Sequence, residues 1–274
     1  MRRTISALAS LVLIAGLAAC GDSGSDDAAS SDPSAVLKVG ASPVPHAEIL
    51  EYVRDNLAAE AGLNLEIVQF ADYIQPNVAL KDGQIDANYF QTVPYLAEQS
   101  AAAGYDFVNV GGVHLEPMGV YSQKVDDIAT LPEGGTIAIP NDASNGGRAL
   151  KLLADNGLIT LKDTGETSPT SKDITDNPKD FKIVEVEAAQ LPRSLEDVDA
   201  AVINGNYAIS ADLNPAKDAL VLESATDNPN VNILVTRNGM QDDPRIQSLI
   251  KLLQGDKVKA FIEEKYQGAV IPAS

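Results

Sequence analysis

The sequence predicts an α/β fold with two lobes. Short apolar runs that read as strands alternate with segments whose apolar residues recur at helical spacing, and this alternation occurs in two series. The rhythm changes near residue 118, where an extended piece has no helix after it. Alternating strands and helices are typical of a mostly parallel sheet with helices on both faces. Two series suggest two similar lobes, and we expect a ligand cleft between them.

The first series opens with a strand over Val36–Ala41 and a helix over His46–Ala61. Its later members are a strand over Leu63–Phe70, a helix over Ile74–Lys81, a strand over Ile85–Tyr89, a helix over Pro94–Ala103 and a strand over Phe107–Val113. The turn residues Asp82 and Gly83 end the second helix.

The second series begins after the extended piece Met118–Ser122. It comprises a strand over Thr136–Ile139, a helix over Ser144–Asn156, strands over Phe181–Glu187, Ala200–Ile203, Leu220–Glu223 and Val231–Thr236, and a helical segment over Pro244–Gln267. The polar stretch Thr160–Lys179 is expected to be a loop with room for a short helix. We predict one lobe from residues 36–119 plus 229–274 and the other from residues 120–228.

The amino terminus has the pattern of a secretory signal peptide. Arg2 and Arg3 precede an uncharged run over Ile5–Ala19, which is shorter than the roughly 20 residues of a membrane span. The run ends in Leu17-Ala18-Ala19-Cys20, which resembles the bacterial lipobox, where cleavage precedes an acylated cysteine. We predict a signal peptide over residues 1–19 and a lipid anchor on Cys20 at the extracytoplasmic face of the cell membrane. An ordinary signal peptide with a chance cysteine is the alternative.

Residues 20–35 are predicted to be the lipidated cysteine and a flexible tether, because Gly, Ser, Asp and Ala bury too little apolar surface to fold. Cys20 is the only cysteine, so the chain can form no internal disulfide. The formal net charge is −19, which makes nucleic acid an unfavourable partner. We interpret this acidity as a means of solubility.

Ligands of open α/β sheets bind beyond the carboxyl ends of the strands. The polar and aromatic residues at these places are Tyr89, Phe90, Gln91, Thr92, His114, Asn141, Ser144, Asn145, Arg148, Asn204, Asn206 and Tyr207. Aromatic, amide and cationic groups suit a ligand with a polar head and an apolar tail. Five of the thirteen aromatic residues lie between Phe70 and Tyr95, Tyr73 among them, and predict a pocket for an apolar side chain. Core packing is the alternative, and strand alternation puts Tyr89 and Phe90 on opposite faces.

Arg148 lies one turn into a predicted helix, where a cation opposes the helix dipole. This position has two interpretations. The residue is a surface arginine, or its planar guanidinium binds a ligand carboxylate together with free N–H groups at the helix start.

Catalysis and metal binding have little support. The chain has two histidines, and His46, beside a predicted helix start, is expected to be a surface or capping residue. No group of His, Cys and carboxylate has metal-ligand spacing, no phosphate loop is present, and no nucleophile stands beside a base. We therefore expect no metal, no cofactor and no enzymatic activity. An envelope enzyme and an adhesin-like surface lipoprotein are the competing hypotheses.

Several motifs resemble the methionine-binding lipoproteins of the NlpA type, the substrate-binding proteins of ABC importers. They are Phe70-Ala71-Asp72-Tyr73-Ile74-Gln75-Pro76-Asn77, Gly83-Gln84-Ile85-Asp86-Ala87-Asn88-Tyr89-Phe90-Gln91, Pro94-Tyr95-Leu96, Glu116-Pro117-Met118-Gly119-Val120-Tyr121-Ser122, Ile139-Pro140-Asn141-Asp142-Ala143-Ser144-Asn145-Gly146-Gly147-Arg148-Ala149-Leu150, Leu191-Pro192-Arg193-Ser194-Leu195, Ala201-Val202-Ile203-Asn204-Gly205-Asn206-Tyr207-Ala208 and Asn230-Val231-Asn232-Ile233-Leu234-Val235-Thr236-Arg237. The resemblance runs from about Lys38 to the end of the chain. It implies a type II periplasmic-binding-protein fold, with a small-molecule ligand enclosed between two lobes, and an ABC permease and its ATPase subunit as partners.

The same resemblance implies residue roles. Tyr73, Tyr89 and Phe90 would line the side-chain pocket, Gln91 and Asn141 lie in the motifs beside it, and His114 faces the cleft. Arg148 would hold the ligand carboxylate, and Asn145 and Asn204 the amino-acid head.

The chain departs from the family pattern at one place. Many members have histidine directly after the glutamine of the Phe-Gln motif, and here that residue is Thr92. Threonine is shorter and cannot become cationic. A methionine-containing dipeptide or another apolar amino acid is therefore an alternative ligand to L-methionine.

Overall fold

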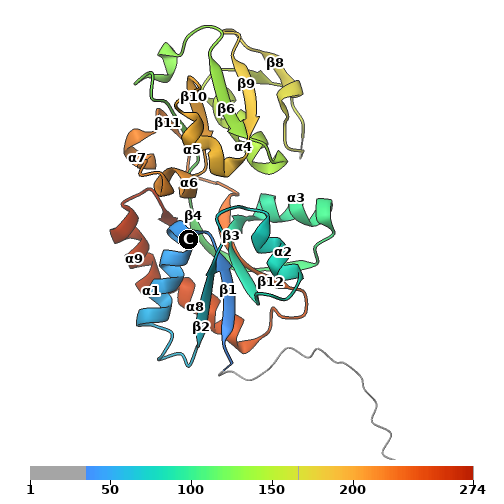
Figure 1. Ribbon diagram of the computed structural model, residues 1–274, viewed down its shortest axis with the longest axis vertical. Helices are drawn as coiled ribbons and strands as arrows, with labels where there is room; N and C mark the ends of the chain where they lie inside the picture. Colours follow the sequence, from blue (N-terminus) through green and yellow to red (C-terminus); the bar gives the residue numbers. More distant parts are fainter. Residues whose placement is uncertain (1–34, 166, 274) are drawn as a thin grey trace, which may run out of the picture. The chain divides into compact units, whose positions relative to one another are not determined.

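The computed structural model describes residues 35–165 and 167–273, which form two lobes, each with its own β-sheet (Figure 1). The predicted signal peptide, Cys20 and nearly all of the predicted tether lie outside the described residues.

The first lobe contains a six-stranded sheet in the order β13-β4-β12-β3-β1-β2. The bounds are β1 (Leu37–Ala41), β2 (Leu65–Gln69), β3 (Ala87–Thr92), β4 (Phe107–Leu115), β12 (Val231–Arg237) and β13 (Ile271–Pro272). β1 pairs in parallel with β2 and β3, but β12 lies between β3 and β4 and is antiparallel to both. The sheet is therefore less parallel than predicted, because the antiparallel strand β12 from a distant part of the chain lies between β3 and β4.

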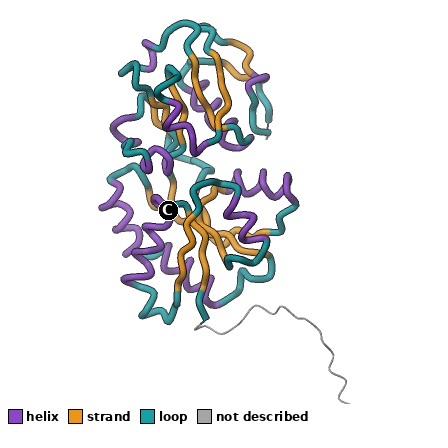
Figure 2. The backbone as a smooth tube through the Cα atoms, in the orientation of Figure 1, coloured by secondary structure: helices purple, strands orange, loops and turns teal. Residues whose placement is uncertain are grey.

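Helices cover both faces of this sheet (Figure 2). They are α1 (Glu48–Asn56), α2 (Gln75–Lys81), α3 (Val93–Ala103), α8 (Pro244–Leu253) and α9 (Asp256–Tyr266). The side chains of β12 point alternately to the two faces of the sheet. Leu234 packs with residues of α1, α8 and α9 on one face, whereas Ile233 and Val235 pack with residues of α2 and α3 on the other.

Two of the predicted helices differ from the structure. The one expected over His46–Ala61 begins at Glu48, after a five-residue π-helix, η1 (Pro43–Ala47), and ends at Asn56. The helical segment Pro244–Gln267 is two helices, because Gly255 has extended backbone angles and caps the start of α9. Glycine is a poor residue for a helix interior, which favours a break at this place.

The second lobe contains a five-stranded sheet in the order β11-β5-β10-β6-β9. The strands are β5 (Gly119–Tyr121), β6 (Thr136–Pro140), β9 (Lys182–Val186), β10 (Ala200–Ile203) and β11 (Val221–Leu222), and the helices are α4 (Ala143–Asp155), α5 (Leu191–Ser194), α6 (Gly205–Ser210) and α7 (Pro215–Asp218). β6 is parallel to β9 and β10, and apolar residues pack on both faces of the sheet.

The polar stretch predicted as a loop contains a small hairpin of β7 (Thr160–Leu161) and β8 (Ile174–Asp176). Short 3-10 helices lie at Ile128–Thr130, Ser171–Asp173 and Ala188–Gln190. These elements and α5–α7 are too short to produce a periodic pattern in the sequence.

The chain passes between the two sheets at two places. The first crossing segment, residues 116–118, joins β4 to β5, and the second, residues 223–230, joins β11 to β12. Within the described part of the chain, no helix has the length and apolar character that crossing a membrane requires.

Candidate ligand-binding site

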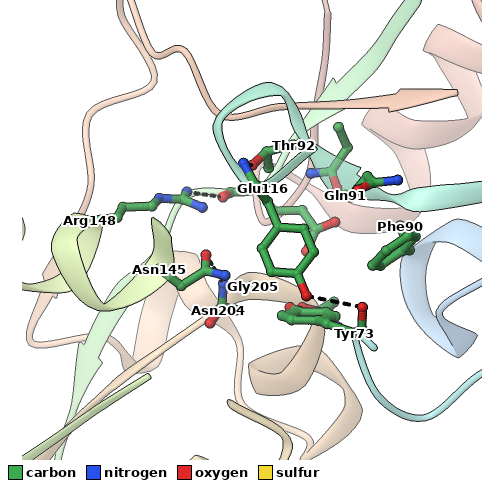
Figure 3. Close-up of a pocket in the computed structure, with 12 residues that line it drawn as sticks. Tyr73, Phe90, Gln91, Thr92, Glu116, Asn145, Arg148, Asn204 and Gly205 are labelled. Carbon is green, nitrogen blue, oxygen red and sulfur yellow. Dashed lines mark hydrogen bonds between the residues drawn. The ribbon is translucent and has the colours of Figure 1, made fainter. Parts of the chain in front are cut away.

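A pocket of about 350 Å³ is lined by residues of both lobes and of the first crossing segment. Its walls are formed by Tyr73, Phe90, Gln91, Thr92, Tyr95, Glu116, Asn145, Arg148, Asn204, Gly205, Asn206 and Asn232. Figure 3 shows the two kinds of wall: Tyr73 and Phe90 on one side, Arg148 and Asn145 on the other. Eight of the twelve residues come from the carboxyl end of β3, from the segment directly after β10 and from the start of α4, where ligands of α/β sheets bind.

Six of the nine predicted site residues line this pocket: Tyr73, Phe90, Gln91, Asn145, Arg148 and Asn204. The other three do not. Tyr89 and His114 are fully buried outside the pocket lining, and Asn141 is exposed.

Strand alternation explains the different places of Tyr89 and Phe90. Both lie on β3 and therefore point to opposite faces of the sheet. Tyr89 packs in the core of the first lobe with the residues of α1, whereas Phe90 faces the ligand pocket.

The aromatic wall consists of rings in mutual contact. Tyr73 lies at the centre, with its ring centroid 6.0 Å from Phe90, 5.7 Å from Tyr95 and 4.9 Å from Tyr207. The hydroxyl of Tyr95 donates to the backbone carbonyl of Tyr73 at 3.0 Å, which holds the Tyr95 ring against the main chain of Tyr73. The result is an apolar surface held in one conformation, which suits the side chain of a small ligand.

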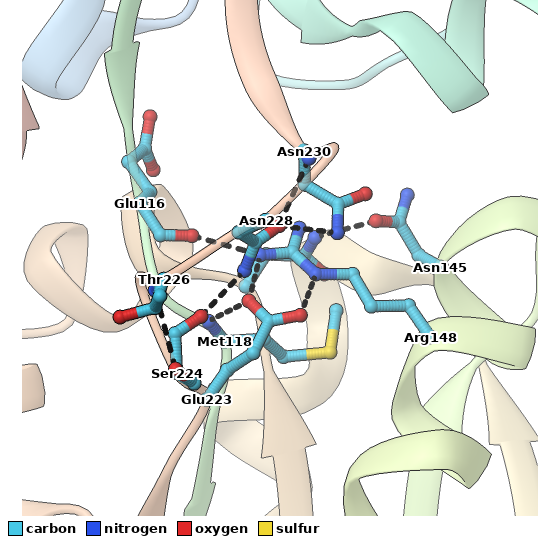
Figure 4. Close-up of polar contacts among 10 residues, drawn as sticks. Glu116, Met118, Asn145, Arg148, Glu223, Ser224, Thr226, Asn228 and Asn230 are labelled. Carbon is cyan, nitrogen blue, oxygen red and sulfur yellow. Dashed lines mark hydrogen bonds and ion pairs between the residues drawn. The ribbon is translucent and has the colours of Figure 1, made fainter. Parts of the chain in front are cut away.

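Arg148 is held by other groups of the protein (Figure 4). Its Nε and Nη2 donate to the two carboxylate oxygens of Glu223, at 2.9 and 2.5 Å, and Nη2 also donates to the backbone carbonyl of Glu116 at 2.9 Å. Burial alone would raise the pKa of Glu223, but the hydrogen bonds and charge of Arg148 outweigh it, so this pKa lies below its usual range.

Arg148 lies between the pocket and a wider, more open hollow of about 1260 Å³, and it lines both. The hollow is lined largely by polar residues of α4 and of the second crossing segment. It lacks the aromatic wall, so we assign the ligand to the smaller pocket.

The amides at the polar wall form a chain. Asn204 Nδ2 donates to Asn145 Oδ1 at 2.9 Å, and the backbone N–H and side-chain amide of Asn145 both donate to Asp142, the N-cap of α4. The remaining buried oxygen of Asn204, Oδ1, has no hydrogen-bond partner among the described residues. An unpaired buried acceptor beside a pocket suits a ligand that donates a hydrogen bond.

Close backbone packing positions α4. A Cβ atom on Gly146 would lie 2.7 Å from the carbonyl oxygen of Pro140, at the end of β6. Only glycine permits this approach, which brings Asn145 and Arg148 to the pocket.

Buried histidines lie behind the pocket. His114 Nε2 lies 2.7 Å from Glu116 Oε1, while the hydroxyl of Tyr89 hydrogen-bonds to the other ring nitrogen of His114. His46 Nε2 lies 2.9 Å from Asn232 Oδ1 and 3.3 Å from Glu116 Oε1. The expectation that His46 is a surface or capping residue is wrong: its exposed fraction is 1%, because the π-helix η1 turns it into the core.

Burial governs the charge of this cluster. It lowers the pKa of His46 to about 4 and that of His114 to about 3, so both rings are neutral at physiological pH. Burial raises the pKa of the Glu116 carboxyl, an effect that the nearby His46 and Arg148 oppose.

His46, His114 and Glu116 also form the one group in the described ranges with three potential metal ligands, whose ligand atoms lie within 4.8 Å of one another. These atoms already have hydrogen-bond partners in Asn232, Tyr89 and one another. Of the ring nitrogens in this cluster, Nδ1 of His46 is the one without a hydrogen-bond partner among the described residues, and the absence of a metal stays a prediction.

Hydrogen bonds join the two lobes around the pocket. Tyr73 donates its hydroxyl proton to Asn206 Oδ1 at 2.5 Å, and the backbone N–H of Ser144 donates to Glu98 of α3 at 3.0 Å. The hydroxyl of Tyr207 donates to the carbonyl of Ala71 at 3.2 Å. The pocket is thus enclosed by direct contacts between the lobes.

Sequence reasoning missed several residues that line the pocket as site residues: Thr92, Tyr95, Glu116, Gly205, Asn206 and Asn232. Thr92 and Asn206 do follow predicted strands, and Tyr95 belongs to the aromatic cluster, so each had a signal. Glu116 begins one of the motifs that carry the family resemblance, but no role was predicted for it, and Asn232 lies within a strand from a distant part of the chain.

Comparison with known proteins agrees with this architecture. Residues 37–274 match the family model of the NlpA lipoproteins. The methionine-binding lipoprotein MetQ of Bacillus subtilis is 43% identical over 269 residues, which cover 96% of each chain. The D-methionine-binding lipoprotein MetQ of Salmonella typhi is 40% identical over 98% of this chain and 97% of its own. A Burkholderia cenocepacia nutrient-binding protein, solved with bound methionine, is 44% identical with a TM-score of 0.84 over 87% of this chain and 100% of its own.

The fold and the enclosed pocket define a two-lobed substrate-binding protein, a class without enzymatic activity. The chain belongs to the NlpA lipoprotein family.

Proposed function

We propose that this protein is the receptor of an ABC importer, which holds L-methionine between its lobes and delivers it to the permease and its ATPase subunit. One observation carries the proposal: the enclosed pocket has an aromatic wall facing a wall of amides and an arginine. An amino acid with an apolar side chain likewise consists of an apolar part, the side chain, and a polar part, the amino and carboxylate groups.

The aromatic wall suits a thioether. Sulfur makes favourable contacts with aromatic rings, and the unbranched methionine side chain adapts to an irregular space. The rings of Tyr73, Phe90 and Tyr95 surround the apolar part of the pocket. The relatives from Bacillus subtilis and Salmonella typhi, a methionine-binding and a D-methionine-binding lipoprotein, support the same ligand.

The polar wall suits the head of an amino acid. Among the described hydrogen bonds of Arg148, those from Nε and Nη2 go to protein groups, and none leaves from Nη1. Nη1 therefore has N–H groups for a ligand carboxylate, while Asn145 and Asn204 supply further polar contacts. Tyr89 and His114 would support the site from behind, and Asn141 would have no direct contact with the ligand.

The ligand can be identified directly. We expect mass spectrometry of material released by denaturing the purified protein to detect methionine, and calorimetry on the ligand-free protein to give tighter binding for L-methionine than for L-leucine or glycyl-methionine. Release of a compound that is not an amino acid, with no heat on adding L-methionine, would contradict the proposed function.

Anchoring at the membrane is a separate part of the proposal. Cys20 is the proposed acylation site, and two or more acyl chains would hold the protein stably, because each buried methylene contributes about 0.8 kcal/mol. Cys20→Ala should move the protein from the membrane fraction to the soluble fraction. Wild-type retention of this variant in membranes would exclude the anchor.

A further inference from the structure

We propose that Asn77, Asn88 and Gln91 are positioning residues. Their side chains form a buried amide cluster that fixes a β-bulge at Phe90 and thereby sets the preference of the pocket for a long apolar side chain. This inference deepens the proposed function and rests on it, because it assumes an amino-acid ligand. Asn77 and Asn88 do not line the pocket, so any effect on the ligand passes through the residues that they hold.

Strand β3 contains one extra residue at Phe90. In the pairing of β3 with β12, Leu234 lies opposite Tyr89. Its neighbour Ile233 lies opposite Gln91, so Phe90 has no partner on β12. Bulges of this kind redirect a side chain and are common beside functional sites. Phe90 lines the ligand pocket (Figure 3), so the bulge lies where it can aim this ring at the ligand.

The bulge also decides where Gln91 points. In a regular strand, residues three positions apart point to opposite faces of the sheet. Asn88 and Gln91 are three positions apart, yet Gln91 Nε2 donates to Asn88 Oδ1 at 2.8 Å. The extra residue between them therefore brings both amides to the same side, and their hydrogen bond joins the two ends of the bulge.

Asn77, in the first turn of α2, completes the amide cluster. Its Nδ2 donates to Gln91 Oε1 at 3.1 Å, and its Oδ1 accepts from Gln91 Nε2 and from Asn88 Nδ2, each at 2.9 Å. Asn88 Nδ2 also donates to the backbone carbonyl of Pro76 at 3.3 Å. The three side chains are at most 2% exposed, so the loss of one would leave buried amide groups of the others unpaired.

Gln91 lines the pocket but has no N–H group left for the ligand. A glutamine amide has two donor hydrogens, and both are used within the amide cluster. We therefore interpret Gln91 as a residue that holds the bulge.

The amide cluster connects the two halves of the aromatic wall. Phe90 belongs to β3, whereas Tyr73 lies in the turn before α2. The carboxylate of Asp72 accepts hydrogen bonds from two backbone N–H groups at the start of α2, at 2.7 and 2.8 Å, which joins this turn to the helix. Loss of the cluster should therefore disturb the contact between the Phe90 and Tyr73 rings, and with it the binding of the ligand side chain.

The test compares two ligands that share the amino-acid head. L-2-aminobutyrate is methionine without its methylthio group. We expect the wild-type protein to prefer methionine about 30-fold or more, because the methylthio group is buried against aromatic rings. Asn77→Ala should weaken methionine binding about tenfold and aminobutyrate binding less than about threefold, as measured by calorimetry.

Asn88→Ala opens the same cluster from β3 and should have the same effect. Asn177→Ala is the matched control, because it also removes side-chain hydrogen bonds, those with the main chain of Phe181, but in the second lobe. It should leave the preference for methionine unchanged. Equal losses for the two ligands in Asn77→Ala and Asn88→Ala, or no loss, would overturn the positioning role and leave the proposed function standing.

A measurement on the wild-type protein needs no variant to fold. Hydrogen exchange of the side-chain amides, followed by nitrogen-15 NMR, should be at least about tenfold slower for the amide cluster than for the exposed Asn64, with and without methionine. Exchange as rapid as that of Asn64 would overturn the amide cluster. Failure of the wild type to bind methionine would overturn the proposed function and this inference together.

Discussion

The guanidinium of Arg148 and the carboxylate of Glu223 form a two-point ion pair, with Nε donating to Oε1 at 2.9 Å and Nη2 to Oε2 at 2.5 Å (Figure 4). Their side chains are 9% and 16% exposed, so the pair is largely shielded from water. Glu223 begins the second crossing segment, and Arg148 lies on α4. The pair therefore holds the proposed ligand-binding cation in one orientation and ties α4 to the connection between the lobes.

Removal of the cation should weaken ligand binding strongly. Arg148→Ala would leave the ligand carboxylate unpaired in an enclosed pocket, which costs about 2–5 kcal/mol, or roughly 30-fold to several thousand-fold in affinity. Arg148→Lys should recover only part of the loss, because an ammonium cannot bind Glu223 at two points and still serve the ligand. Calorimetry with L-methionine measures both effects.

Arg193→Ala is the matched control, since Arg193 is exposed on α5 and does not line the pocket. A loss below about threefold for Arg148→Ala, with an unchanged circular dichroism spectrum, would mean that another group binds the carboxylate.

Glu223→Gln should destabilise the ligand-free protein. The change keeps the shape of the side chain but leaves the guanidinium of Arg148 without its counter-charge, and breaking a buried pair costs about 3–5 kcal/mol. We expect the free energy of unfolding in urea to fall by about 3 kcal/mol. Glu66→Gln serves as the control, because its ion pair with Lys38 is about half exposed and should contribute less than about 1 kcal/mol. Similar losses in the two variants would contradict the structural role of Glu223.

The sequence was most informative where local pattern and structure coincide. The strands and long helices of both lobes occur close to their predicted positions, because the apolar residues that build each core recur with the period of their element. The same alternation separates Tyr89 in the core from Phe90 in the pocket. Seven of the twelve pocket residues follow predicted strands: Phe90, Gln91, Thr92, Asn145, Arg148, Asn204 and Asn206.

Local sequence patterns could not predict the contacts between distant segments of the chain. The insertion of β12 between β3 and β4 brings Asn232 to His46, and nothing in the local sequence of either residue indicates this contact. Arg148 and Glu223 are 75 residues apart, so the ion pair that orients the guanidinium also depends on the tertiary fold. The burial of His46 has the same origin, since its place is decided by the packing of η1 and not by the nearby helix start.

Closure of the lobes should depend on the hydroxyl of Tyr73. It donates to Asn206 Oδ1 across the cleft at 2.5 Å, so Tyr73→Phe removes an inter-lobe hydrogen bond but keeps the aromatic wall. A hydrogen bond of this kind contributes about 0.5–1.5 kcal/mol, and we expect a loss of roughly threefold to tenfold in methionine affinity. Small-angle scattering should show a smaller compaction on ligand addition.

Tyr105→Phe is the matched control, because Tyr105 stacks on Phe107 away from the pocket and no hydrogen bond of its hydroxyl is found among the described residues. Unchanged affinity and compaction in Tyr73→Phe would show that this hydrogen bond does not contribute to closure.

Acidification should destabilise the fold through the buried histidines. In the folded protein the pKa of His46 is about 4 and that of His114 about 3, whereas both rings titrate near 6.5 when exposed. As the pH falls below about 6.5, the unfolded chain binds protons that the folded chain does not, so the free energy of unfolding decreases. The stabilisation is fully present above pH 6.5 and is lost progressively toward about pH 4 for His46 and about pH 3 for His114.

Each histidine contributes a slope of up to about 1.4 kcal/mol per pH unit within its window. Urea unfolding between pH 7.5 and 4.5 measures the total slope, to which the carboxylates also contribute. Comparison with His114→Gln isolates one histidine, because glutamine can still bond to Tyr89 and Glu116 but does not titrate. Between pH 6 and pH 5, we expect the free energy of unfolding of this variant to fall by about 1 kcal/mol less than that of the wild type.

His46 is the other histidine in the sequence, so His46→Gln combined with His114→Gln should remove the histidine contribution altogether. Equal slopes in the wild type and the double variant would mean that both rings remain free to protonate in the folded protein.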